Sequence, residues 1–389
     1  MTKPQHAIWT KSFLSVFMAS LLIFTAFYLL LPTLPLYLVK ILNAGPVFTG
    51  IVLAAFTMAA VIIRPVTGYM IDRHGRKWIY LFGLIFFMLS FAGYMVAYTL
   101  ALMLLLRMIH GLFWGITTTA GSTIVVDLLP PHRRGEGLGY FGLASTIPMA
   151  IGPMLGLYLI SGENYNPMFV AAICICILGI AFALGIRYPD IPLHTTRFSF
   201  KNLFEVSSLP VALILFINMI TYGGVVTFIS LYVKETGIGD AGIFFLVYAV
   251  GITLARLFSG KVFDREGPLR LSTAAFLMIS LGFLGLSLIH SPAGFFGSAF
   301  IMGLGGGVLF PSCQAMVNNM VEPGRRGAAN STLFTVLDLG IGVGMILTGY
   351  LAGFSGLETA FLVCSALNGI ALVLFLVFTH TYYQRHKLF

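Results

Sequence analysis

The chain reads Arg64-Pro-Val-Thr-Gly68-Tyr-Met-Ile-Asp72-Arg73-His-Gly75 at the end of its second apolar stretch. The same pattern returns 192 positions later as Arg256-Leu-Phe-Ser-Gly260-Lys-Val-Phe-Asp264-Arg265-Glu-Gly267. That shift also relates Arg133-Arg134-Gly135 to Arg325-Arg326-Gly327, and Gly111 and Gly115 to Gly303 and Gly307. The repeat predicts two halves in the same orientation, because a shift across six membrane helices preserves direction.

The composition indicates a membrane protein. Hydrophobic residues make up 58% and charged residues 9% of 389 positions, whereas soluble domains have about 45–50% and 25%. A helix needs about 20 apolar residues to cross a bilayer. The apolar stretches predict an all-α integral membrane protein with twelve spans in two six-helix parallel repeats, at 13–39, 48–70, 78–97, 100–127, 137–160, 167–186, 208–233, 241–260, 271–289, 294–319, 329–352 and 358–380.

The longest polar connection lies between the two repeats. We expect six-helix bundles at 1–186 and 208–389, joined by a cytoplasmic linker at 187–207 in which Arg197–Phe204 forms an interfacial segment. The first stretch is longer than a signal-peptide core and is kept as a span. If the amino terminus is cytoplasmic, Lys40 and Lys234 are the only lysines or arginines in the outside loops. The positive-inside rule therefore predicts a multi-pass cell-membrane protein with both termini cytoplasmic.

Several other functions are disfavoured. The net charge of +9 is spread over short loops, so no nucleic-acid partner is expected. The four cysteines lie in apolar stretches and predict no metal site. The glycine runs at 303–307 and 340–344 lack the strand that a dinucleotide cofactor needs. Ser355 falls at a helix end, apart from His290 and His380, so we expect no enzyme, no catalytic residues and no cofactor.

Three motifs resemble the major facilitator superfamily over nearly the whole chain. Gly68-x-x-x-Asp72-Arg73-x-Gly75-Arg76-Lys77 is similar to the signature between its second and third helices. Arg107-x-x-x-Gly111-x-x-x-Gly115 resembles a motif of the fourth helix, and Asp127 with Arg133-Arg134-Gly135 resembles the loop that follows. The resemblance implies the major facilitator fold and transport by alternating access.

A fourth motif concerns the direction of transport. Gly152-Pro153-x-x-Gly156 resembles the antiporter motif of the fifth helix, although Pro148 and Leu157 stand where the fuller pattern has glycines. The resemblance implies membership of the twelve-helix drug:proton antiporter branch.

The resemblance also implies a cytoplasmic gate. In it, Asp72 stabilises the amino terminus of a neighbouring helix while Arg73 and Arg76 engage Asp127, a latch that holds the outward-open state. The predicted gate residues are Gly68, Asp72, Arg73, Gly75, Arg76, Asp127, Asp264 and Arg265.

Polar residues inside the spans are candidates for the substrate cavity. Arg107 lies about 10 Å into the fourth span, too deep for most rotamers to reach water, and His110 and Trp114 share its helix face. One-turn polar pairs occur in the seventh and tenth spans. The predicted cavity residues are Arg107, His110, Trp114, Asn218, Tyr222, Gln314 and Asn318. The alternative for each is helix packing or hydrogen bonding between helices.

Asp338 is the only acid expected near the bilayer centre. A carboxyl group in that environment can bind and release protons near neutral pH. We therefore predict that Asp338 couples transport to protons, with a structural carboxylate as the alternative.

The sequence favours a proton-coupled antiporter that exports a small amphipathic or drug-like molecule and works as a monomer in the lipid bilayer. The first span contains no acid, so a neutral, anionic or zwitterionic substrate is favoured over a cationic one. The alternative is a proton-coupled importer or uniporter of a polar metabolite such as a sugar or organic anion, which Arg107 could bind.

Overall fold

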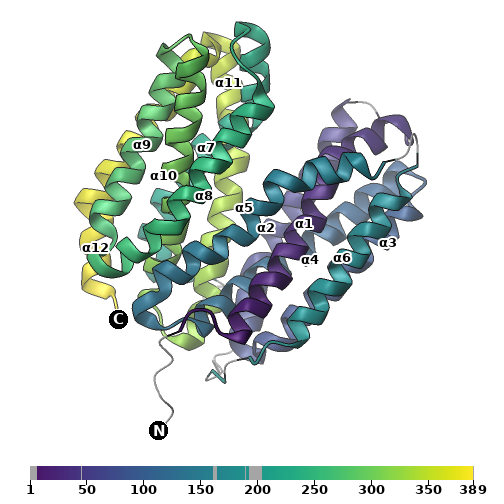
Figure 1. Ribbon diagram of the computed structural model, residues 1–389, viewed down its shortest axis with the longest axis horizontal. Helices are drawn as coiled ribbons and strands as arrows, with labels where there is room; N and C mark the ends of the chain where they lie inside the picture. The colour runs from purple at the N-terminus through teal and green to yellow at the C-terminus, as the bar shows by residue number, and fades with distance from the viewer. Residues whose placement is uncertain (1–6, 45, 161–163, 189, 192–203, 389) are drawn as a thin grey trace. The chain divides into compact units, whose positions relative to one another are not determined.

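The computed structural model describes residues 7–44, 46–160, 164–188, 190–191 and 204–388 (Figure 1). The predicted interfacial segment Arg197–Phe204 lies outside the described residues except for Phe204. In the first half of the chain the helices are α1 (Lys11–Lys40), α2 (Pro46–His74), α3 (Arg76–Met95), α4 (Leu100–Leu128), the short η1 (Pro131–Arg133), α5 (Arg134–Tyr158) and α6 (Asn166–Leu184).

The second half repeats this series. Its helices are η3 (Val206–Ser208), α7 (Leu209–Thr236), α8 (Ala241–Glu266), α9 (Pro268–Leu288), α10 (Pro292–Asn319), η4 (Pro323–Arg325), α11 (Arg326–Leu374), the π-helical turn η5 (Phe375–Thr379) and α12 (His380–His386).

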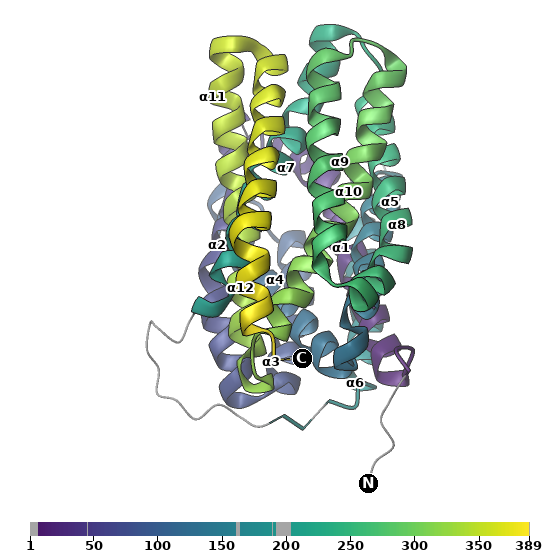
Figure 2. The same ribbon diagram turned by 90° about the vertical axis from the view of Figure 1, so that its left-hand side faces the viewer.

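α11 is two membrane-crossing helices rather than one. Its 49 residues would extend roughly 70 Å as a straight helix, more than twice the hydrocarbon thickness of about 30 Å. Gly356 breaks it with φ 83° and ψ 164°, a conformation that favours glycine. Figure 2 shows the chain turning back and descending as the helix that leads into α12.

The prediction of twelve spans is confirmed. Among the described residues, 11 helical segments are long and apolar enough to cross a membrane, and the last, Pro323–His386, contains the break at Gly356. Dividing that segment gives twelve crossing helices.

Helix starts are fixed by equivalent residues in the two halves. The Thr99 side chain accepts a hydrogen bond from the amide of Leu102 at the start of α4. Ser291, 192 positions later, accepts one from the amide of Gly294 at the start of α10. These caps satisfy backbone donors that have no partner inside the helix.

The chain forms two compact units with exchanged segments. The first unit comprises Met1–Pro130, Leu143–Phe204 and Pro323–Ser331, and the second comprises Pro131–Gly142, Glu205–Glu322 and Thr332–Phe389. The start of α5 therefore belongs to the second unit and the start of α11 to the first. The predicted bundles at 1–186 and 208–389 do not include this exchange.

Within each unit, glycines allow helices to approach closely. A Cβ atom on Gly111 would overlap the carbonyl oxygen of Phe56, which packs α4 on α2, and one on Gly303 would overlap the equivalent carbonyl oxygen of Tyr248, which packs α10 on α8. Figure 1 shows α3, α4 and α6 side by side in the first unit, and Figure 2 shows α9 beside α10 in the second. Small residues serve this purpose in membrane helices, where close packing stabilises association.

Candidate functional site

The two repeated turns have the same backbone geometry. Gly75 joins α2 to α3 with φ 88° and ψ 170°, and Gly267 joins α8 to α9 with φ 77° and ψ −175°. Positive φ at both positions explains why glycine occupies them. Asp72 and Asp264 lie two residues before the ends of α2 and α8, and each faces the start of another helix.

Asp72 caps α11 within the first unit. Its Oδ1 accepts a hydrogen bond from the amide of Gly327 at 2.9 Å and its Oδ2 one from the amide of Ala328 at 2.8 Å. Asp72 is buried, 3% exposed. A carboxylate at this position satisfies two backbone donors and lies at the positive end of the helix dipole.

Asp264 caps α5 in the same way within the second unit. Its Oδ1 accepts from the amide of Gly135 at 2.9 Å and its Oδ2 from the amide of Glu136 at 2.8 Å. All the residues of this contact are related to those of the Asp72 contact by the shift of 192 positions. The sequence repeat is therefore a repeat of one capping geometry.

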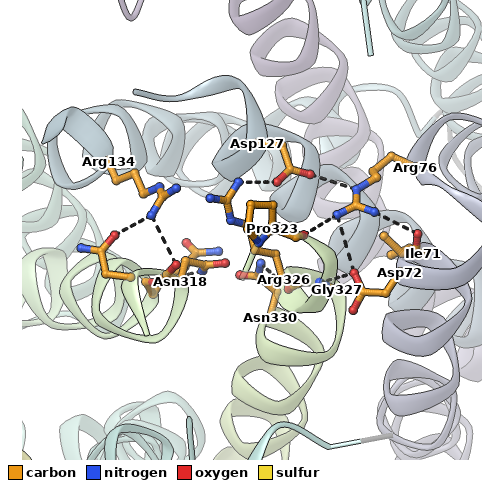
Figure 3. A network of polar contacts seen from close by, with 12 residues as sticks. Ile71, Asp72, Arg76, Asp127, Arg134, Asn318, Pro323, Arg326, Gly327 and Asn330 are labelled. Atoms are coloured by element: carbon orange, nitrogen blue, oxygen red, sulfur yellow. Dashed lines mark hydrogen bonds and ion pairs between the residues drawn. The ribbon is translucent and has the colours of Figure 1, made fainter. Parts of the chain in front are cut away.

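Asp127, at the end of α4, binds two arginines. Its Oδ2 lies 2.9 Å from Arg76 Nε, and its Oδ1 lies 2.7 Å from Arg326 Nη1 (Figure 3). The Asp127 side chain has no exposed surface, and the arginines are 2% and 5% exposed. Arg76 also donates to the carbonyl oxygen of Pro323 at 2.8 Å. We call Asp72, Arg76, Asp127, Arg326 and the capped amides the Asp127 network.

Asn319, at the end of α10, is the equivalent centre in the second unit. Its Oδ1 accepts a hydrogen bond of 2.7 Å from Arg134 Nη1, and the same nitrogen donates to the carbonyl oxygen of Asn318 at 3.3 Å (Figure 3). Arg134 is 1% exposed. We call Asp264, Arg134, Asn319 and the capped amides the Asn319 network.

The two networks differ by one pair of opposite charges. The repeat places Pro268 opposite Arg76 and Asn319 opposite Asp127, so the Asn319 network lacks one cation and one anion that the Asp127 network has. Each network therefore contains equal numbers of positive and negative groups. This balance matters because an unpaired buried charge is strongly destabilising.

The remaining predicted gate residues lie around the two caps. Gly68 packs on the start of α11, where a Cβ atom would come within 2.6 Å of Ser331 Cβ. Arg73 is exposed and its guanidinium donates to the Tyr69 hydroxyl. The resemblance implied that Arg73 engages Asp127, but Arg326 takes that place. Arg265 is exposed.

His110 lies in the interior of the first unit. It has no exposed surface, its Nδ1 is 2.8 Å from the Tyr94 hydroxyl, and its ring is 4.4 Å from Phe87 and 4.9 Å from Phe91. Trp114 stacks on Phe27 at 4.3 Å. These contacts place both side chains among aromatic rings of the first unit.

Arg107 is also buried, 5% exposed. Its Cζ lies 4.3 Å from the centre of the Phe56 ring, a cation–π contact. Its Nε has no hydrogen-bond partner among the described residues. The side chain therefore keeps a donor that an anion could accept from.

The polar pairs of the second unit bond in two ways, Asn218 to a neighbouring helix and Asn318 within its own helix. Asn218 Nδ2 donates to Asn368 Oδ1 at 3.0 Å, and Asn368 Nδ2 donates to Thr221 Oγ1 at 3.0 Å. The rings of Tyr222 and Tyr248 are stacked, with 6.2 Å between their centres. In α10, Gln314 and Asn318 are buried, and Asn318 Nδ2 donates to the Gln314 carbonyl oxygen.

Asp338 and the glycines of α5 complete the predicted residues. Asp338 is half-buried in α11, and the other acids among the described residues lie at or near helix ends or in connections.

In α5, Gly152 packs on Tyr28 and Gly156 on Leu29, both in α1. The backbone of Pro153 lies in α5 between them. The antiporter-like motif therefore lies at a close contact of α5 with α1.

Comparison with known proteins identifies the family. The model of the Major Facilitator Superfamily matches residues 16–297 and 211–388. The chain belongs to the Major Facilitator Superfamily. Members of this family are transporters, and the chain is a transporter rather than an enzyme.

Relatives of this facilitator include named export proteins. The staphylopine export protein of Staphylococcus aureus is 25% identical over 385 residues, which cover 93% of this chain and 94% of the relative. The multi-drug resistance efflux pump PmrA homolog of Lactococcus lactis is 24% identical and covers 91% of this chain and 90% of its own length. The crystal structure of the human organic anion transporter MFSD10 (TETRAN) superposes with a TM-score of 0.84 at 19% identity, covering 94% of this chain and 98% of that one, which confirms the fold.

Sequence reasoning did not select Arg134, Arg326 and Asn319, although they hold both networks of this facilitator together. The shift of 192 positions already related Arg134 to Arg326, and applied to Asp127 it also gives Asn319. The role predicted for Asp127 and the Arg133-Arg134-Gly135 motif therefore extends to the second copy.

Proposed function

We propose that this facilitator is a proton-coupled antiporter that exports a small amphipathic molecule from the cytoplasm. The observation that carries the proposal is its similarity, along nearly the full length, to a relative named for staphylopine export. The multi-drug efflux relative supports the same direction. The packing of the antiporter-like Gly152 and Gly156 on α1 agrees with a structural role for that motif in such a transporter.

We assign proton coupling to Asp338. It is the acid in the interior of a membrane-crossing helix among the described residues, and intramembrane acids are the usual sites of proton relays. The substrate is expected to be neutral, anionic or zwitterionic. Buried Arg107, with a free donor at Nε among the described residues, favours a carboxylate or similar group on the substrate.

We assign the Asp127 network to the cytoplasmic gate. Its contacts hold the start of α11 to α2 and α4 within the first unit. Alternating access requires two conformations of a transporter, and charge-assisted bonds of this kind can stabilise one of them. In the proposed cycle these bonds break when the substrate site opens to the cytoplasm.

The test uses proteoliposomes that contain a pH-sensitive dye. Candidate drugs, organic acids and sugars are added one at a time, and the direction of proton flux is recorded for the wild type and for Asp338→Asn. Proton flux opposite to substrate flux that disappears in the variant is the expected result. Proton flux in the same direction as the substrate would replace export with import, and unchanged coupling in Asp338→Asn would make Asp338 a structural residue.

A second function, uptake of an organic anion, is favoured by the same Arg107 donor. A proton-coupled importer and a proton-coupled exporter of one substrate differ in whether protons and substrate move in the same or in opposite directions, so the sign of the proton flux separates the two. Substitution Arg107→Lys keeps the charge but removes the planar donor set. We expect it to raise the KM for a carboxylate substrate under either function.

A further inference from the structure

Among the described residues, Asn319 is hydrogen-bonded to three residues outside α10. Its Oδ1 accepts from Arg134 Nη1 at 2.7 Å, its Nδ2 donates to the Tyr383 hydroxyl at 3.4 Å, and its backbone oxygen accepts from the amide of Leu388 at 2.8 Å. Two of these partners come from the segment Tyr383–Leu388, which includes the last turn of α12 and the residues after it. This segment is therefore part of the Asn319 network.

The Asn319 network has the contacts of this segment, and the Asp127 network has a second arginine instead. Asp127 is fixed from two directions by Arg76 and Arg326. Asn319 receives only Arg134 from the repeated positions, because Pro268 replaces the arginine. The hydrogen bonds with Tyr383 and Leu388 are the second set of contacts that holds Asn319.

Arg134 decides which way the Asn319 amide faces. An amide has an oxygen that accepts and an NH₂ group that donates, on opposite sides, and a guanidinium can only donate, whereas a tyrosine hydroxyl can donate or accept. Oδ1 therefore faces Arg134, and the Tyr383 hydroxyl holds the other side of the amide by accepting from Nδ2. Rotation of the amide would place two donors against each other, at a site where Arg134 is 1% exposed.

We propose that the segment Tyr383–Leu388 is a brace that fixes Asn319 for Arg134 and so controls how firmly residues 131–142 are held in the second unit. Residues 131–142 contain the start of α5, whose amides bind Asp264. Loosening the brace weakens Arg134–Asn319 and releases this helix start. The Asp127 network shares no residue with the brace, and we expect it to be unaffected.

Leu388 offers a clean way to remove one contact. Its side chain is 54% exposed, so the structure uses mainly its backbone amide. Leu388→Pro removes that donor, and Lys387, at φ −66° and ψ 134°, already has the conformation that precedes a proline. Leu388→Ala is the matched control, because it shortens the same side chain and keeps the donor.

The experiment is hydrogen–deuterium exchange on the full chain in nanodiscs. In Leu388→Pro we expect amides of residues 131–142 to exchange about two- to tenfold faster than in Leu388→Ala, the change expected from losing one hydrogen bond. Residues 323–331 are the internal control, because they belong to the Asp127 network, and their exchange should not change. Equal exchange of 131–142 in the two variants overturns the proposal.

A second variant guards against a general loss of structure. Tyr383→Phe removes only the hydroxyl from a buried ring and should also speed exchange in 131–142 without affecting 323–331. If either variant speeds exchange equally in both segments, the segment stabilises the whole protein and is not a brace for Asn319.

Discussion

Asp127 and Asn319 occupy equivalent positions at the ends of α4 and α10, and each accepts a hydrogen bond of 2.7 Å from the arginine that begins a helix of the other half of the chain. One is charged and the other neutral. This difference goes with a second one. The position that is Arg76 in the first half of the chain is Pro268 in the second half, so only Asp127 has a second arginine to bind. Charge balance in a buried site, rather than identity of residues, is what the two halves have in common.

Asp127→Asn should be the most destabilising single change in its network. It leaves Arg326 buried without a carboxylate and Arg76 with only the 3.6 Å ion pair to Asp72, and removing one partner of a buried ion pair costs about 3–5 kcal/mol. The double variant Arg76→Pro/Asp127→Asn reproduces the residues of the Asn319 network and should be more stable than Asp127→Asn alone. Thermal unfolding of the purified protein in detergent measures both. If the double variant loses as much stability as the two single variants together, charge balance does not govern the site.

Asp72→Ala and Asp264→Ala should each release one helix start and leave the other unchanged. Each removes the acceptor of two backbone amides, and a buried unsatisfied donor costs about 1–3 kcal/mol. Hydrogen–deuterium exchange should therefore rise in residues 323–331 for Asp72→Ala. For Asp264→Ala it should rise in residues 131–142. Exchange that rises in the opposite segment would contradict the assignment of the caps.

Gly111→Ala should prevent normal packing of α4 on α2, because its Cβ would overlap the Phe56 carbonyl oxygen. Gly303→Ala should have the same effect in the second unit. Gly342→Ala in α11 is the control, since a Cβ there meets nothing within 4 Å, and alanine is favoured over glycine by about 1 kcal/mol inside a helix. The yield of folded protein after detergent extraction should fall for the first two and not for the third. Equal yields would mean that the helices can move apart freely.

Tyr94→Phe tests whether His110 is a packing residue. The variant removes the hydroxyl that lies 2.8 Å from His110 Nδ1 and leaves a buried polar atom without that partner, which costs about 1–3 kcal/mol. We expect a lower unfolding temperature than in the wild type. An unchanged unfolding temperature would contradict a packing role for His110.

The sequence by itself determined that this protein is a twelve-helix membrane transporter with two repeated halves. Apolar composition and the spacing of spans are local properties, because each helix satisfies its own backbone hydrogen bonds in the bilayer. The shift that relates Asp72 to Asp264 is equally visible without coordinates. The resemblance carried by those residues led to the family that the comparisons then established.

Only the tertiary structure decided which residues meet. Asp72 and Gly327 are far apart in the chain, and nothing in the local pattern says that the start of α11 is completed by a carboxylate from α2. The structure also placed Arg326, rather than Arg73, on Asp127, and put His110 among aromatic rings. Such pairings depend on how helices pack, because one helix presents several polar faces and only its neighbours determine which of them is buried, paired or free.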